Sequence, residues 1–211
     1  MIPIRPQPEP ISFDQLVRKK GKLFLRKFSN SKPPIEELEK RNYWKHIRKD
    51  LYDAYDGICA YSAHWIPFTD NPNVDHYLPK SIRPDLAYEW NNYRLACSYA
   101  NTLKKDFQDV LDPFQICNDM FFLDFPSLLV IANPALTEKE KKSVEKTIDR
   151  LKLNDDRYIN VRSRWLELYC KEGLTLSGLK KSAPFIAYEI ERQNLIEEIK
   201  NIMIFGLETE D

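Results

Sequence analysis

The chain has 211 residues and carries 32 basic and 32 acidic side chains, so its formal net charge is zero. Hydrophobic residues make up 43% of the sequence and aromatic residues 12%, a composition that excludes an intrinsically disordered chain. Because the chain as a whole is not basic, any contact with nucleic acid must come from a local patch of positive charge.

The remaining bulk features predict a mainly helical, cytoplasmic protein. The sequence contains only 5 glycines but 14 prolines, which favours helices with rigid connections over a turn-rich β fold. No run of 18 apolar residues occurs, so no membrane span is expected, and residues 1–10 lack the apolar stretch of a signal peptide. The four cysteines are too widely spaced for the disulfide framework of a secreted domain.

The first 57 residues favour two helices. Residues 13–25 are expected to form the first, which becomes basic towards its end through Arg18, Lys19, Lys20, Lys22, Arg26 and Lys27. Such a run is typical of a solvated face, and a phosphate-contacting surface is the alternative. Pro33 and Pro34 predict the start of a second, long helix, and Gly57 predicts its end. Trp44 lies near the apolar face of this second helix.

Residues 58–110 break the helical pattern. Residues 74–78 are typical of a strand that Pro79 ends, and a polar, proline-containing loop follows to about residue 88. Residues 93–97 predict a second strand, and residues 98–110 a helix. The expected order in this segment is therefore strand, loop, strand, helix.

The rest of the chain is expected to be helical apart from the aromatic residues 120–125, which favour a strand pair or a buried turn. Thr137 and Glu140 form the sequence signature of a capping box before a helix that ends near Leu151. Asn154 is expected to cap the next helix, and a last helix begins near Pro184. These patterns predict three segments, residues 1–57, 58–112 and 113–211, in one compact domain.

Asp75, His76 and Asn101 have the chemistry of a phosphodiester-cleaving site. Hydrolysis needs an activated water, and a histidine with a pKa near neutrality, here His76, can take the proton of that water. Mg²⁺ or Mn²⁺ prefers oxygen ligands, which Asp75 and Asn101 offer. Adjacent side chains on a strand point to opposite faces, so Asp75 and His76 can share a site only where the strand ends or bends, and Pro79 favours such an end.

The strings VDHYLPKS at residues 74–81 and WNNYRLACSYAN at residues 90–101 resemble the HNH endonuclease family. The resemblance implies a small ββα-metal motif in a mainly α (α+β) fold and Mg²⁺- or Mn²⁺-dependent hydrolysis of DNA. It also implies that Asn92 ties the loop to the second strand; Asn91 is the alternative, but Asn92 gives the better register with Asn101. The implied metal ligands are Asp75 and Asn101, within the catalytic set His76, Asp75, Asn92 and Asn101.

The structural zinc of many HNH proteins is not expected in this chain. That zinc is held by two Cys-x-x-Cys pairs. Here Ser62 stands at the second position of the pair that begins with Cys59, and Ala100 at that of the pair beginning with Cys97. His64 offers a third ligand, but a fourth is missing. We expect Cys59 and Cys97 to pack together as small apolar residues, with the flanking helices stabilising the motif instead of the metal.

Basic residues close to the motif are the candidates for contact with the phosphate backbone, which dominates nucleic-acid affinity. Pairing with Asp85 or Glu89 is an equal alternative for Arg94. No string indicates base-specific recognition. The candidates are Lys80, Arg83, Arg94, Lys104 and Lys105.

Residues 58–62, 74–81 and 90–95 are also similar to those of bacterial HNH proteins that are paired with an ATPase in Septu-type anti-phage systems. This similarity implies a partner ATPase that gates cleavage, and a neutral net charge fits a subunit that does not hold DNA unaided. A single active centre cuts one strand, so a double-strand break requires a homodimer or two sequential nicks. Two alternatives remain: a catalytically inactive HNH-like binding module, and an interaction protein whose helices form its main surface.

Overall fold

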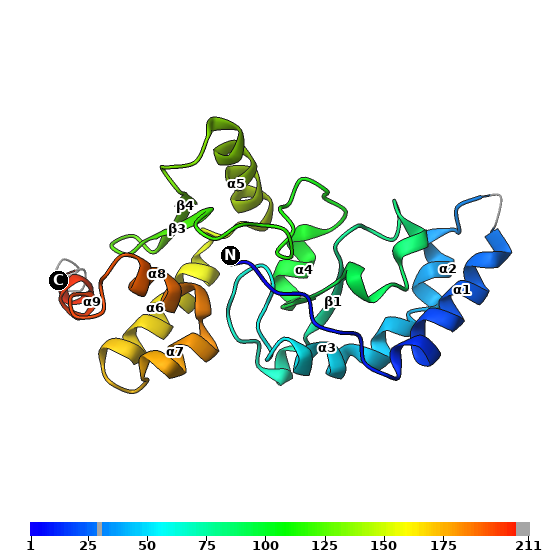
Figure 1. The fold of residues 1–211 in the computed structure, drawn as a ribbon, viewed down its shortest axis with the longest axis horizontal. Helices are drawn as coiled ribbons and strands as arrows, with labels where there is room; N and C mark the ends of the chain where they lie inside the picture. Colours follow the sequence, from blue (N-terminus) through cyan, green and yellow to red (C-terminus); the bar gives the residue numbers. More distant parts are fainter. Residues whose placement is uncertain (29–30, 206–211) are drawn as a thin grey trace. The chain divides into compact units, whose positions relative to one another are not determined.

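The computed structural model describes residues 1–28 and 31–205, and it is mainly helical with two small antiparallel sheets (Figure 1). The chain divides into two compact units. The N-terminal unit consists of Arg5–Ala60 and Ile66–Gln108; the C-terminal unit consists of Met1–Ile4, Tyr61–Trp65 and Asp109–Asp211. Among the described residues, no helix is long and apolar enough to cross a membrane.

The neutral net charge conceals an uneven distribution between the two units. The N-terminal unit contains 18 basic and 13 acidic residues, an excess of five positive charges. The C-terminal unit contains 14 basic and 19 acidic residues, an excess of five negative charges. The excess of positive charge therefore lies in the N-terminal unit.

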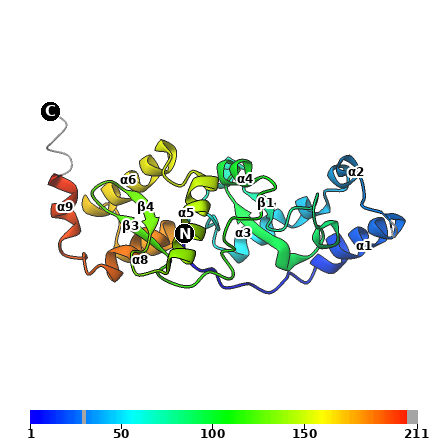
Figure 2. The ribbon, with the colours of Figure 1, turned by 90° about the horizontal axis from the view of Figure 1, so that it is seen from above.

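Helices form most of the first half of the N-terminal unit. The first helix was expected at residues 13–25, and this prediction is confirmed, although its first turn is a π-helix. Figures 1 and 2 show α1 and α2 at one end of this unit and β1 and α4 at the other. The elements are η1 (Asp14–Arg18), α1 (Lys19–Leu25), η2 (Arg26–Phe28), α2 (Ile35–Lys40), η3 (Tyr43–Ile47) and α3 (Arg48–Ala54).

The prediction of one long helix from Pro33 to Gly57 is wrong, because the chain bends at Arg41 and Asn42. Both residues have non-helical ψ angles, 50° and 53°. The Arg41 guanidinium lies 4.7 Å from the centroid of the Phe24 ring and pairs with Glu37. Arg41 thus makes one local and one tertiary contact at the bend, which separates α2 from η3 and α3.

The expected order of strand, loop, strand and helix is confirmed. β1 (Asn73–His76) pairs antiparallel with β2 (Tyr93–Ala96), and His76 lies opposite Tyr93. Short 3-10 turns occupy the preceding segment and the loop: η4 (Phe68–Asp70), η5 (Pro84–Leu86) and η6 (Trp90–Asn92). The helix α4 (Ser98–Lys104) ends earlier than expected, because Lys105 adopts a positive φ of 46°.

The C-terminal unit packs a β-hairpin against helices. Phe121 and Leu123 of β3 are buried, and the backbone N–H of Leu123 donates to the buried carboxylate of Glu189 at 2.9 Å. This strand confirms the expectation for residues 120–125, whereas β4 and α7 were not expected. The elements are β3 (Phe121–Asp124), β4 (Leu129–Ala132), α5 (Glu138–Leu151), α6 (Asp156–Cys170), α7 (Leu176–Ser182), α8 (Pro184–Arg192) and α9 (Ile199–Phe205).

Two predictions about helix starts in this unit have different outcomes. The capping box of Thr137 and Glu140 is present at the start of α5. Asn154 does not cap α6; Asp155 does, by accepting from the N–H of Arg157 at 3.0 Å. The helix expected from Pro184 onward is interrupted between α8 and α9.

Candidate functional site

A pocket of about 270 Å³ opens in the N-terminal unit beside β1. It brings together five of the residues that the sequence singled out: Asp75, His76, Lys80, Asn101 and Lys105. Asp75 and His76 share it although they are neighbours in the chain, because β1 ends at His76. The other lining residues are Trp44, Asn73, Val74, Pro79 and Asp106.

The imidazole of His76 is held in one orientation. Its Nε2 lies 2.9 Å from the carbonyl oxygen of Ala87. A carbonyl oxygen only accepts, so Nε2 carries the proton and Nδ1 carries the lone pair. The rings of Trp44 and Tyr93 pack against His76 with centroid distances of 4.6 and 5.1 Å. No described residue bonds to Nδ1, which is the nitrogen left to act on a ligand in the pocket.

Burial also fixes the charge of His76. The side chain is 9% exposed, and this burial lowers its pKa to about 3. The Lys80 and Lys104 ammonium groups act in the same direction, while the bond to Ala87 opposes them. The ring is therefore neutral near pH 7, with Nδ1 able to accept a proton.

Asp75 is paired with a lysine from the helix that follows the second strand. Lys104 of α4 is completely buried, and its Nζ lies 3.3 Å from Asp75 Oδ2. The same ammonium donates to the carbonyl oxygen of His76 at 3.0 Å. A buried charge without such partners costs several kcal/mol. The contacts with Asp75 and with the His76 carbonyl oxygen therefore compensate for the burial of the Lys104 ammonium. One side chain thus fixes the end of β1 at the pocket.

The oxygen donors of the pocket fit a hard divalent cation. Asp75 offers a carboxylate and Asn101 an amide oxygen, and no described residue hydrogen-bonds to the Asn101 side chain. Mg²⁺ takes one or two carboxylates and keeps several waters, so this sparse set suits it. Within residues 1–28 and 31–205, no group of three or more His, Cys, Asp or Glu side chains is arranged to hold a metal ion.

Asn92 lies outside the pocket and binds the loop that shapes it. Its Oδ1 accepts from the N–H of Leu78 at 2.8 Å, and its Nδ2 donates to the carbonyl oxygens of Leu78 and Leu86 at 3.0 and 3.2 Å. The side chain is buried, whereas the neighbouring Asn91 is exposed. Asn92 therefore joins both ends of the loop between β1 and β2.

Two of the five basic candidates reach the pocket. Lys80 is half-buried and its Nζ lies 4.8 Å from the centroid of the Trp44 ring. Lys105 is exposed at the end of α4. Arg83 is exposed but does not line the pocket, and it makes a two-bond ion pair with Asp85 at 2.9 and 2.6 Å.

Arg94 and Lys104 were expected to contact phosphate, but both side chains are buried. Neither is therefore exposed for such a contact. Arg94 is 3% exposed, and its Nη1 donates to two backbone carbonyl oxygens at 2.8 and 2.9 Å. The alternative pairing of Arg94 does not occur either: Asp85 pairs with Arg83, and Glu89 with Arg18 and Lys22. Arg94 and Lys104 support the motif from within.

Among the pocket residues that sequence reasoning missed are Trp44 and Asp106. Trp44 appeared only as part of an apolar helix face, yet it packs against His76 and carries Lys80 over its ring. Asp106 is exposed and accepts from Ser81 Oγ at 2.7 Å. Nothing in the local sequence marks either residue, because the bend at residues 41–42 and the end of α4 place them.

Cys59 and Cys97 contact each other, as expected from the sequence. Their Sγ atoms are 3.8 Å apart, well beyond the roughly 2.05 Å of a disulfide. The N–H of Cys97 donates to Cys59 Sγ, and the N–H of Ala100 donates to Cys97 Sγ, each at 3.4 Å. Cys97 therefore caps the N-terminus of α4, the helix that carries Asn101.

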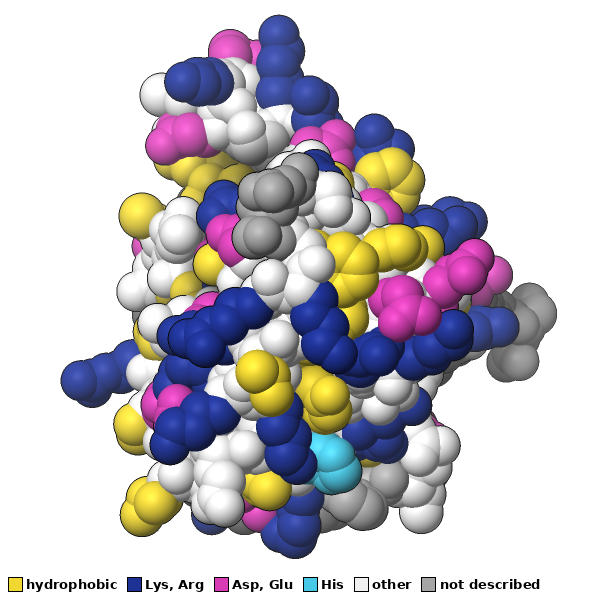
Figure 3. All heavy atoms as spheres, turned by 90° about the vertical axis from the view of Figure 1, so that its right-hand side faces the viewer, with side chains coloured by type: hydrophobic (Ala, Val, Ile, Leu, Met, Phe, Trp, Pro, Cys, Tyr) yellow, Lys and Arg dark blue, Asp and Glu magenta, His cyan; other side chains and the backbone are white. Residues whose placement is uncertain are grey.

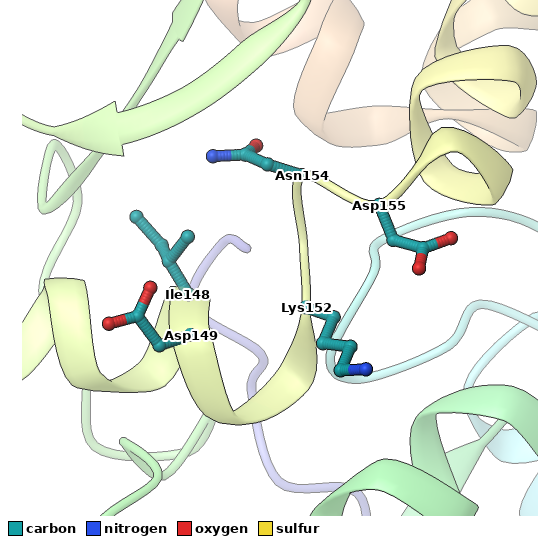
Figure 4. Close-up of a pocket in the computed structure, with 5 residues that line it drawn as sticks. All are labelled: Ile148, Asp149, Lys152, Asn154 and Asp155. Carbon is teal, nitrogen blue, oxygen red and sulfur yellow. The ribbon is translucent and has the colours of Figure 1, made fainter.

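The C-terminal unit has a second hollow, of about 290 Å³, between the end of α5 and the start of α6 (Figure 4). Asn154 exchanges two hydrogen bonds with the backbone of Val130, at 2.8 and 2.9 Å, and Asp155 caps α6. Figure 4 shows the lining side chains pointing in different directions rather than converging. The polar groups of this hollow thus serve the fold. The residues drawn are Ile148, Asp149, Lys152, Asn154 and Asp155.

Comparison of the chain with protein-family models and with curated proteins finds no match in either case.

Proposed function

We propose that this protein is a metal-dependent endonuclease of the HNH type that hydrolyses DNA phosphodiester bonds. The observation that carries the proposal is one pocket lined by His76, Asp75 and Asn101, in which no described residue bonds to Nδ1 of His76. The order of β1, β2 and α4 is that of a ββα motif. The positive charge of the N-terminal unit supports an anionic substrate.

In the proposed reaction, water attacks phosphorus while Nδ1 of His76 takes its proton. The bond from phosphorus to the leaving oxygen breaks, and that oxygen takes up a proton from solvent water. Asp75 and Asn101 would hold the divalent cation, which stabilises the charge that develops on the phosphate. Lys80 and Lys105 line the same pocket and attract the anionic substrate. A phosphate anion beside the imidazole favours its charged form, so substrate binding raises the pKa of His76 towards the range where a base is effective.

Nicking of supercoiled plasmid in Mg²⁺ or Mn²⁺ tests the proposal. His76→Ala should slow nicking by about 100-fold or more, as expected for the loss of a general base. His46→Ala is the matched control, because His46 is exposed and does not line the pocket. We expect wild-type nicking from this control. Equal traces of nicking by wild type and His76→Ala would refute the proposal.

Binding of the metal is tested separately from cleavage. Mn²⁺ or Mg²⁺ should raise the melting temperature of the wild type, because a ligand that binds only the folded state stabilises it. Asp75→Asn should reduce that response. A wild type that responds to metal but never nicks would favour the catalytically inactive HNH-like module. An equal response in wild type and Asp75→Asn would contradict the assigned ligand.

The proposal extends to the nuclease subunit of a bacterial anti-phage system, controlled by a partner ATPase. Its support is the similarity of residues 58–62, 74–81 and 90–95 to ATPase-paired HNH proteins, together with the neutral net charge of the chain. An ATPase encoded beside this chain should bind it and change the rate of plasmid nicking with ATP. No binding, or a rate that does not depend on the ATPase, would contradict this extension.

A further inference from the structure

The lysines and arginines on the surface of the N-terminal unit fall into two groups. In the first, each cation pairs with a carboxylate: Lys19 with Asp14, Lys22 with Glu89, Lys40 and Arg41 with Glu37, Lys49 with Asp53, and Arg83 with Asp85. Besides Arg5, Arg26, Lys27 and Lys32, the second group includes Lys20, Lys45, Lys80 and Lys105. Within the described parts of the chain, none of the latter four lysines has a carboxylate oxygen within 4.0 Å.

Two of these four lysines lie over aromatic rings that are joined to each other. Lys20 Nζ is 5.9 Å from the centroid of the Tyr43 ring, and Lys80 Nζ is 4.8 Å from that of Trp44. Both rings pack on Tyr88, with centroid distances of 5.7 and 5.9 Å. Tyr43, Tyr88 and Trp44 thus form a continuous aromatic cluster from Lys20 to Lys80, in which Tyr88 and Trp44 are buried.

The other two lysines, Lys45 and Lys105, lie next to this aromatic cluster and in the pocket lining, respectively. Lys45 directly follows Trp44 on η3 and is exposed. Lys105 lines the pocket together with Lys80. Two acidic residues, Glu39 and Asp106, act electrostatically on Lys80 without forming an ion pair with it. Figure 3 shows the end of the molecule that carries α1 and α2, where Lys and Arg side chains dominate the middle and lower parts of the face.

We propose that Lys20, Lys45, Lys80 and Lys105 form a phosphate track that holds the sugar–phosphate backbone of DNA and leads it to the pocket, with Lys20 and Lys80 supported by the Tyr43 and Trp44 rings beneath them. Carboxylate-paired cations are already neutralised, whereas unpaired ones release counterions when they meet phosphate, which is the main source of nucleic-acid affinity. This inference rests on the proposed function for the destination of the track. The binding itself requires no cleavage.

The test is the salt dependence of DNA binding by the full chain, measured by fluorescence anisotropy with a labelled duplex in EDTA. The track variant is Lys20→Gln with Lys45→Gln. The control variant is Lys40→Gln with Lys49→Gln, which removes the same charge from paired lysines of the same helical region. Each lost phosphate contact changes the slope of log Kobs against log salt by about 0.9 and weakens binding about eightfold at roughly 0.1 M salt. We expect a slope reduced by about 1.8 in the track variant and a wild-type slope in the control.

Equal losses in both variants would mean that only net charge matters, and the track would be overturned. Unchanged binding by the track variant, or no binding by the wild type, would overturn it as well. Both pairs of lysines are exposed, so thermal melting should show intact folds. In one outcome, the wild type never nicks plasmid while the track variant still shows the reduced salt slope. That pair of results would support the track and contradict the proposed nuclease function. Plasmid nicking by the wild type, together with equal salt slopes in the track and control variants, would support the nuclease function and contradict the track.

Discussion

The ammonium of Lys104 lies 3.3 Å from Asp75 Oδ2, and the two side chains are 0% and 6% exposed. The same ammonium donates to the carbonyl oxygen of His76. One buried cation therefore sets the position of the proposed metal ligand and of the backbone that carries the proposed base. Since Lys104 belongs to α4, the same helix that supplies Asn101, the pocket is assembled only when helix and strand pack together.

Breaking this pair should destabilise the fold strongly. Lys104→Met leaves the buried Asp75 carboxylate without its ammonium, so we expect the free energy of unfolding to fall by about 3 kcal/mol. Urea denaturation measures it. Lys105→Met is the control: Lys105 is exposed and its removal should change stability by less than about 0.5 kcal/mol. Adding Asp75→Asn to Lys104→Met should cost less than Asp75→Asn alone, and strict additivity would show that the pair contributes nothing.

The loop between the strands should loosen when Asn92 is replaced. Asn92→Ala removes three hydrogen bonds and leaves the N–H of Leu78 unpaired, so we expect a loss of about 2 kcal/mol. Hydrogen exchange should also be faster at the Leu78 amide. Asn91→Ala deletes the same amide group from an exposed position and should alter neither quantity. Equal exchange in both variants would contradict the role of Asn92 as the residue that holds the loop.

The local structure around the pocket could be predicted because its signals are local. Residues 74–78, ended by Pro79, mark β1, and residues 93–97 mark β2. In the C-terminal unit, Thr137 with Glu140 likewise marks the start of α5. The bend at residues 41–42 has no such signal. It depends on Arg41 contacting Phe24, a residue that lies on another helix, and helical periodicity alone continues through it.

For the candidate site, too, some features could be predicted from the sequence and others could not. Asp75, His76 and Asn101 could be placed together because residue type and order were sufficient to suggest their chemistry. Burial was not predictable: Arg94 and Lys104 have the same charge as exposed lysines, yet both lie inside the fold. Pairing of charges was not predictable either, and it separates the lysines of the proposed track from paired ones such as Lys40 and Lys49. These properties arise from tertiary packing.

The stability of the fold should fall in mild acid because of His64. Burial, aided by the charge of Arg162, lowers the pKa of His64 to about 3, against about 6.5 in the unfolded chain. Between these values the unfolded state binds a proton that the folded state does not. Stability is therefore full above about pH 6.5 and falls as pH decreases, with His64 contributing about 1.4 kcal/mol per pH unit and buried His76 a similar amount. Urea denaturation of His64→Gln should show a shallower pH dependence, while the exposed His46→Gln keeps the wild-type slope. A wild-type slope in both would contradict the assignment.

Removing the charge of Arg162 should stabilise the protein. Arg162 on α6 is 2% exposed, and its Nε and Nη2 have no hydrogen-bond partner in the described part of the chain. Burial lowers its pKa to about 10, so the guanidinium is still charged near neutral pH. An apolar side chain of similar length avoids that buried charge, and we expect Arg162→Met to raise the free energy of unfolding by about 1–3 kcal/mol. Arg164→Met, which removes an exposed arginine paired with Glu167 on the same helix, should change it by less than about 0.5 kcal/mol. Urea denaturation near pH 7 compares the two, and a clear loss of stability in Arg162→Met would mean that the buried guanidinium is satisfied in solution.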